Sequence, residues 1–103
     1  MLREYEVPAT FFVVGKAAER QPRLLYRMAR EGHSLGNHSW SHAHLNVCSR
    51  DAIRRELQQT DAVIYAATGE RTNLVRPPFG ARSFVVLDEI RRLIESYERQ
   101  ENR

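Results

Sequence analysis

The strongest constraint on the fold is an alternation of short apolar segments with segments of helical periodicity. The segment at residues 9–14, Ala-Thr-Phe-Phe-Val-Val, is uncharged and rich in β-branched and aromatic residues, which suits a buried strand. A chain that repeats strand and then helix predicts a parallel sheet whose strands are joined by crossover helices. The predicted strands are residues 9–14, 33–37 and 74–75, and the predicted helices run from Gln21-Pro22 to Gly32, from Ser49 to Gly69 and from Ser83 to Gln100.

The ends of these helices carry recognisable signals. Pro22 stands in the first turn, where proline is tolerated, and Gly32 fits a left-handed stop. Ser49 suits an N-cap, with Asp51 in the first turn, and Gly69 ends that helix. The apolar stripes comprise Leu24, Leu25, Met28 and Ala29 in the first helix, Ile53, Leu57, Ile64 and Ala67 in the second, and Phe84, Leu87, Ile90, Ile94 and Tyr97 in the third.

Length and composition limit the classes of protein. The 103 residues suffice for one small α/β domain of about three β/α units, residues 1–103. The net charge is +3, but basic residues alternate with acids along the helices, which indicates solvated faces rather than a nucleic-acid surface. No apolar run approaches the roughly 20 residues that a membrane span needs. The N-terminus has no signal-peptide core, which leaves the localisation unassigned. The single Cys48 is expected to be a small, partly buried residue.

A pair of histidines, His38 and His42, is the first candidate site. Two imidazoles four residues apart converge on one metal ion if the backbone is helical or tightly turned there. A catalytic metal also needs a third protein ligand and an open position. The alternative is that both are ordinary polar loop residues. His44 could replace either as a ligand, and His33 is expected to be structural.

The segment Arg76-Pro77-Pro78-Phe79-Gly80 is the second candidate site. Its prolines fix the backbone and remove two N–H donors, so the segment is stiff. A fixed guanidinium can orient a carboxylate, and a fixed N–H at Phe79 can stabilise an oxyanion. The alternative is a rigid turn that carries a surface arginine.

Three segments together, residues 7–15, 31–42 and 76–80, resemble the polysaccharide deacetylase family, or NodB homology domain, in order and spacing. The resemblance covers about residues 5–83 and leaves residues 84–103 as a divergent charged helix. It implies a distorted (β/α) barrel, of which this chain would form a part. It also implies metal-assisted hydrolysis of N-acetyl or O-acetyl groups on sugar polymers such as chitin, peptidoglycan and xylan.

The resemblance assigns roles to four residues. His38 and His42 correspond to the two histidine ligands of a divalent metal, for which Zn²⁺ is the first expectation. Arg76 corresponds to the arginine that steadies the catalytic base. The backbone N–H of Phe79 corresponds to the oxyanion donor. The implied partner is an acetylated polysaccharide or oligosaccharide.

Two parts of the family pattern are absent from these 103 residues. The Thr-Phe-Asp-Asp-Gly motif, which carries the general base and the third metal ligand, has no counterpart before Ala9. No histidine follows His44 to act as the catalytic acid, and Asp88 and Glu89 match no family motif and are expected on the surface. The sequence therefore predicts a truncated deacetylase with weak or no activity. The alternative is a non-catalytic remnant that binds metal, carbohydrate or a protein partner.

A shortened barrel also has a physical consequence. Outer strands without neighbours present unpaired N–H and C=O groups, and the uncharged segment at residues 10–14 has strong β-propensity. We therefore expect self-association through exposed sheet edges.

Overall fold

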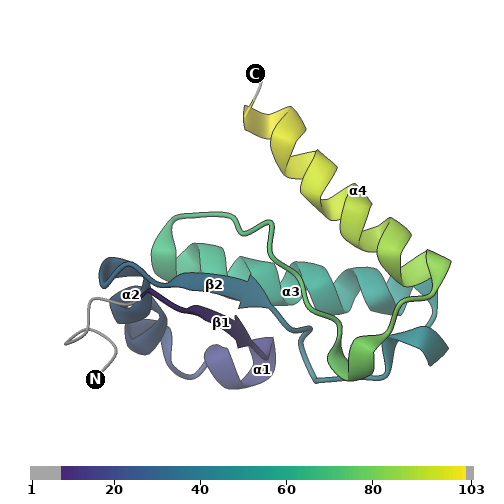
Figure 1. The fold of residues 1–103 in the computed structure, drawn as a ribbon, viewed down its shortest axis with the longest axis horizontal. Helices are drawn as coiled ribbons and strands as arrows, with labels where there is room; N and C mark the ends of the chain where they lie inside the picture. Colours follow the sequence, from purple (N-terminus) through teal and green to yellow (C-terminus); the bar gives the residue numbers. More distant parts are fainter. Residues whose placement is uncertain (1–7, 102–103) are drawn as a thin grey trace.

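The computed structural model describes residues 8–101, and these form a two-stranded parallel sheet with helices packed on one face (Figure 1). This confirms the α/β class. The elements in chain order are β1 (Thr10–Val13), α1 (Gly15–Ala18), α2 (Pro22–Arg30), β2 (Ser34–Asn37), the 3₁₀ turn η2 (Leu45–Val47), α3 (Arg50–Thr68), the 3₁₀ turn η3 (Pro78–Gly80) and α4 (Phe84–Glu101).

The two strands pair in parallel along their full length. Their register runs from Thr10 opposite Ser34 to Val13 opposite Asn37. Because α1 and α2 lie between the strands in the chain, they form the crossover connection that a parallel pair requires. The carboxyl ends of both strands therefore lie at the same edge of the sheet, next to the loop that follows Asn37.

The third predicted strand is reduced to one bridge. Val75 makes a parallel bridge with Asn37, and no longer ladder extends it within residues 8–101. The prediction of a third strand at residues 74–75 is therefore wrong in extent, although its position beside β2 is right. Pro77 and Pro78 follow the bridge immediately, and proline cannot donate to a ladder.

The local signals at the helix ends are confirmed. Ser49 caps α3 by accepting a hydrogen bond from the N–H of Ala52 at 3.1 Å. Gly69 and Gly32 both adopt the left-handed conformation, with φ of 78° and 91°, where α3 and α2 end. The short helix α1 was not predicted, because four residues are too few to show a period.

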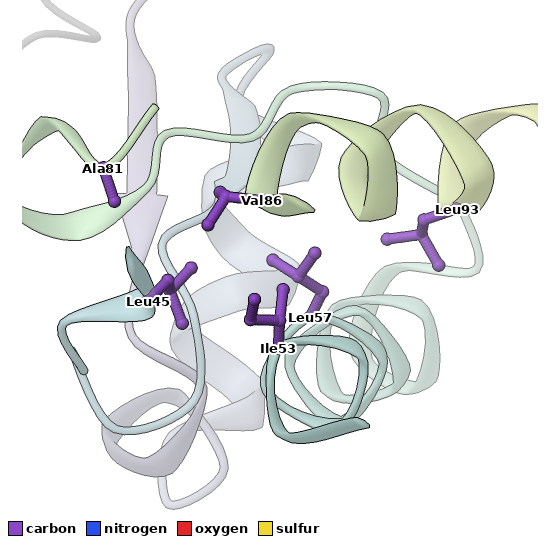
Figure 2. Close-up of a cluster of buried hydrophobic side chains, with 6 residues drawn as sticks. All are labelled: Leu45, Ile53, Leu57, Ala81, Val86 and Leu93. Carbon is purple, nitrogen blue, oxygen red and sulfur yellow. The ribbon is translucent and has the colours of Figure 1, made fainter. Parts of the chain in front are cut away.

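Two buried clusters join the layers. One lies between the sheet and α1 to α3, and its fully buried members are Ala18, Leu25, Leu35 and Ile64. The other lies between α3, α4 and the turns, as Figure 2 shows, and its members are Leu45, Ile53, Leu57, Ala81, Val86 and Leu93. The predicted stripe of α3 is thus confirmed at Ile53, Leu57 and Ile64. Leu24 of α2 is 45% exposed and was wrongly placed in the core.

The predicted stripe of α4 is right in part, because Ile90 and Tyr97 pack against the cluster between α3 and α4. Phe84 and Leu87 are 78% and 48% exposed, whereas Val86 and Leu93 are buried against α3. The prediction chose the longest apolar stripe and ignored the charged residues beside it. No helix within residues 8–101 combines the length and apolarity that a bilayer crossing requires.

Asp88 and Glu89 are buried, at 7% and 3% exposure, so the expectation of a surface role for both is wrong. Arg50 of α3 lies between them, with its Nη1 at 2.7 Å from Asp88 Oδ2 and at 2.7 Å from Glu89 Oε2. Arg54, one turn further along α3, donates from Nε to Glu89 Oε1 at 3.0 Å. These bonds hold Asp88 and Glu89 of α4 against α3, which explains why these two charged residues are buried while Leu87 beside them is exposed.

The same bonds lower the pKa of both carboxyl groups. Hydrogen bonds from Arg50 and Arg91 hold the pKa of Asp88 well below its ordinary value of 3.8. Hydrogen bonds from Arg54 and then Arg50 lower the pKa of Glu89 from its ordinary value of 4.5, although burial acts in the opposite direction.

We predict that the free energy of unfolding falls as the pH drops through the acid range. The unfolded chain binds protons at Asp88 and Glu89 near pH 3.8 and 4.5, whereas the folded chain binds them only at lower pH. The stabilisation is therefore complete above about pH 5 and is lost progressively below it. Urea unfolding should show that Asp88→Asn is less stable than the wild type at neutral pH, by a margin that narrows toward about pH 3.

Glu98→Gln is the matched control, because Glu98 is an exposed carboxylate of the same helix. It should leave the unfolding free energy nearly unchanged at every pH. An Asp88→Asn variant as stable as the wild type at neutral pH would contradict the role given to these ion pairs.

Candidate active site

The loop that leaves β2 and the segment that follows the Val75 bridge lie side by side. The N–H of Arg76 donates to the carbonyl of Asn37 at 2.9 Å, and the N–H of Asn37 donates to the carbonyl of Leu74 at 2.8 Å. These two bonds place the start of the histidine loop next to the Arg-Pro-Pro-Phe-Gly segment. The two candidate sites of the sequence therefore form one site at the carboxyl edge of the sheet.

Asn37 and Ser39 shape the histidine loop from inside. Asn37 is fully buried, its Nδ2 donates to the carbonyl of Leu57 at 2.8 Å, and its Oδ1 accepts from the N–H of Ser39 at 2.9 Å. The Ser39 hydroxyl oxygen then accepts from the N–H of His42 at 3.1 Å. Ser39 and His42 both have positive φ, 68° and 58°, so a tight turn rather than a helix brings His42 back toward His38.

The amino end of α1 also holds the histidine loop through hydrogen bonds. The N–H groups of Gly15 and Lys16 donate to the carbonyls of Ser39 and Trp40, each at 2.9 Å. A Cβ on Gly15 would lie 2.5 Å from Thr60 Oγ1 and 2.6 Å from the Trp40 ring, so only glycine permits this approach.

Glu56 of α3 is a further residue of the loop that the sequence analysis missed. Its Oε1 accepts from the backbone N–H of Trp40 at 3.2 Å and of Ser41 at 2.9 Å, and the Ser41 hydroxyl donates to it at 3.0 Å. These bonds satisfy two amides of an irregular turn. In the sequence Glu56 is one of several charged helix residues, and only the tertiary fold distinguishes it.

The rings of His38 and His42 lie 4.8 Å apart, centroid to centroid, at an interplanar angle of 65°. His38 Nδ1 lies 2.5 Å from the carbonyl oxygen of Arg76, which can only accept, so Nδ1 carries the proton. The neutral ring then keeps its lone pair on Nε2. Metal-binding histidines are commonly oriented in this way, with one nitrogen donating to a backbone carbonyl.

The fit to a divalent metal is partial. The two imidazoles lie side by side, and the Nδ1 of His38 is held by a backbone carbonyl, as is common for metal-binding histidines. The part of the chain that the structure describes holds no group of three or more His, Cys, Asp or Glu residues arranged for a metal. The assignment of His38 and His42 as metal ligands therefore remains a prediction, with the third ligand outside this group.

Phe79 lies against the histidine loop. Its ring stacks on His44 at 3.7 Å and 10°, and meets the edge of His42 at 4.8 Å. Its backbone is left-handed, with φ 58° and ψ 18°. Among residues 8–101 the structure shows no acceptor for the Phe79 N–H. An N–H without an acceptor among these residues suits the oxyanion donor that the sequence predicts, and that role stays a prediction.

The Arg76 guanidinium lies over the ring of Phe12, with Cζ 4.4 Å from the ring centroid. Gly36 makes room for that ring, because a Cβ there would lie 2.6 Å from it. No carboxylate within residues 8–101 forms an ion pair with Arg76. Arg76 is thus positioned by an aromatic ring, and its charge is available to a carboxylate from elsewhere.

The other two sequence expectations at this end of the chain are confirmed. His33 is structural, since its Nδ1 accepts from the N–H of Ala9 at 3.0 Å and its ring meets the Phe11 ring at 5.4 Å. Cys48 is half-buried, and its thiol donates to the carbonyl of His44 at 3.4 Å.

The fold and this site define a part of an α/β domain with a histidine pair at the carboxyl edge of its parallel sheet. The family model described as polysaccharide deacetylase matches residues 1–97. The chain therefore belongs to the polysaccharide deacetylase family.

Relatives within the family are similar in sequence and in structure. The peptidoglycan-N-acetylmuramic acid deacetylase PdaA of Bacillus subtilis strain 168 is 43% identical over 90% of this chain and 36% of its own length. A family 4 acetyl xylan esterase from Clostridium thermocellum, solved in complex with a cobalt ion, superposes with a TM-score of 0.81 at 36% identity over 85% of this chain and 43% of that chain. BA3943 of Bacillus anthracis, a CE4 family pseudoenzyme, gives a TM-score of 0.84 at 30% identity over 89% of this chain and 33% of that chain. This chain thus spans well under half of each relative.

We predict weak divalent-metal binding that depends on His38. With two protein ligands, water must complete the coordination, so zinc should bind with micromolar or weaker affinity in calorimetry. His38→Ala should abolish the binding, whereas His33→Ala, which removes the structural histidine, should leave it. Binding unchanged in His38→Ala would exclude this histidine and direct attention to His44.

We also predict that Glu56→Ala weakens the same binding by about 10- to 100-fold, the usual effect of losing support for a ligand. The variant leaves both imidazoles in place but releases the amides of Trp40 and Ser41. Glu70→Ala is the control, since Glu70 is exposed and its backbone rather than its carboxylate bonds to Thr68. Equal zinc affinities for Glu56→Ala and Glu70→Ala would show that the loop holds its shape without Glu56.

Proposed function

We propose that this chain forms the histidine and oxyanion part of a metal-dependent deacetylase that hydrolyses acetyl groups on amino-sugar polymers. One observation carries the proposal: the rings of His38, His42 and Phe79 come together at one edge of the sheet. Two distant segments of the sequence supply these groups, and the Asn37 bridge to Val75 aligns them.

The residues of the chain support separate parts of the reaction. The N–H of Phe79 stabilises the negative charge that develops on the acetyl carbonyl oxygen during attack. The carbonyl of Arg76 fixes the His38 tautomer, which leaves Nε2 as the nitrogen for a ligand bond. Bound by His38 and His42, a divalent metal such as Zn²⁺ would supply Lewis-acid polarisation and activation of water.

Arg76 has a role that needs a partner. A guanidinium held over the Phe12 ring can orient a carboxylate and lower its pKa. A general base with its pKa set in this way takes a proton from water during hydrolysis. Since residues 8–101 place no carboxylate beside Arg76, we propose that the base comes from sequence outside them.

The substrate class rests on relatives. PdaA is named for deacetylation of N-acetylmuramic acid in peptidoglycan, and the structural relative from Clostridium thermocellum is an acetyl xylan esterase. An N-acetylated amino-sugar polymer is therefore the substrate that we propose, with O-acetylated xylan as the second candidate.

We predict that the 103-residue chain releases acetate slowly or not at all from acetylated chito-oligosaccharides or peptidoglycan with added zinc or cobalt. Absence of a general acid or base costs about 10²- to 10⁴-fold for each group. The same chain, extended at both ends by the residues that the flanking codons encode, should show metal-dependent acetate release that His38→Ala abolishes. Acetate release by the extended chain that persists in His38→Ala would refute the proposed function.

The similarity to BA3943, a pseudoenzyme, favours a second candidate, a non-catalytic metal- or carbohydrate-binding module. The acetate assay separates the two. Zinc binding and retention on an acetylated polymer, without acetate release by the extended chain, would support the binding module.

A further inference from the structure

The stacked pair of His44 and Phe79 is the closest ring contact among residues 8–101, at 3.7 Å and nearly parallel. Burial does not explain it, because Phe79 is 62% exposed and His44 is exposed as well. Two exposed rings that stack face to face fix each other's position without contributing to the hydrophobic core.

Phe79 needs such a restraint. For a residue with a Cβ, the left-handed region is sterically disfavoured relative to the right-handed conformation. Pro78 before it is buried, and Gly80 after it has φ 66°. Phe79 and Gly80 are therefore two consecutive left-handed residues, and Phe79 is the one that carries a side chain. The bond from the Ala81 N–H to the Pro78 carbonyl, at 3.2 Å, closes the turn but does not hold the Phe79 ring.

His44 is better anchored than its partner. Its carbonyl accepts from the N–H of Val47 at 3.2 Å and from the thiol of Cys48 at 3.4 Å, at the start of η2. The next residue, Leu45, is completely buried in the cluster between α3 and α4. The imidazole is therefore attached to a turn that is anchored in the core, and the Phe79 ring packs against it.

We propose that His44 is a positioning residue: its imidazole stacks on Phe79 and holds that residue's peptide in the left-handed conformation that directs its N–H. Rotation about the N–Cα bond of Phe79 would turn the peptide plane that carries this N–H relative to the ring. The geometry stands by itself, and only the use of the N–H as an oxyanion donor rests on the proposed function. His44 is thereby assigned to the support of Phe79 rather than to the metal.

The test is NMR of the metal-free chain, with two substitutions at one position. His44→Ala removes the stacked ring, and His44→Tyr keeps an aromatic face. In the wild type and in His44→Tyr, Phe79 should show the strong intraresidue HN–Hα NOE that marks a positive φ, with ring protons at position 44 shifted upfield. In His44→Ala this NOE should weaken toward the intensity of residues with negative φ, while the thermal midpoint stays close to that of the wild type.

Val47→Ala is the control, since Val47 is 86% exposed in the same turn and has no ring that could stack on Phe79. It should keep the wild-type HN–Hα NOE at Phe79. A Phe79 NOE unchanged in His44→Ala overturns the proposal, as does a loss in His44→Tyr equal to that in His44→Ala.

Failure of the proposed function and failure of the His44 proposal give different experimental results. If zinc calorimetry shows no binding that depends on His38, the deacetylase role fails, whereas the Phe79 NOE is measured without metal and is unaffected by that result. Zinc affinity in His44→Ala should stay within about twofold of the wild type if His44 supports Phe79 alone, and its loss would reassign His44 as a metal ligand.

Discussion

The buried amide of Asn37 is the contact on which the rest of the site depends. Its Nδ2 ties the end of β2 to α3 through the Leu57 carbonyl, and its Oδ1 starts the turn that contains Ser39. Its backbone joins the segment from Leu74 to Arg76, because its N–H donates to the Leu74 carbonyl and its carbonyl accepts from the Arg76 N–H. One residue thus couples the sheet, the long helix and both candidate segments. Removal of this buried amide would be strongly destabilising, because each of its partner groups would stay buried without a hydrogen bond.

Features that depend on a few neighbouring residues were predictable from the sequence. The caps of α3 at Ser49 and Gly69 are local, since side-chain acceptance and positive φ need no tertiary partner. The two motifs at His38 and Arg76 were identified as a pair through resemblance, and the bridge between Asn37 and Val75 explains why they belong together. The metal and oxyanion roles of these residues remain predictions.

Features that depend on distant partners were not predictable. Glu56 supports a loop 15 and 16 residues away, and nothing in its own helix distinguishes it from other acids. The predicted face of α4 was wrong at Phe84 and Leu87, and its neighbours Asp88 and Glu89 pair instead with Arg50 and Arg54, 35 to 39 residues earlier. Apolar periodicity alone cannot identify a buried face when ion pairs compete with it. The third strand was too short to form because the prolines at 77 and 78 follow directly.

Three residues of the site, Ser39, His42 and Phe79, have left-handed backbones although each carries a Cβ. Such residues are held by their surroundings, and each costs free energy that the rest of the fold must offset. Backbone strain alone would therefore favour glycine at all three positions, since glycine adopts this conformation without the steric penalty. Each of those replacements would delete a hydroxyl, an imidazole or a phenyl ring from the site. In this chain the most easily stabilised backbone positions are also those at which stabilisation would erase the chemistry, so a thermostabilised descendant should be sought through changes at other positions.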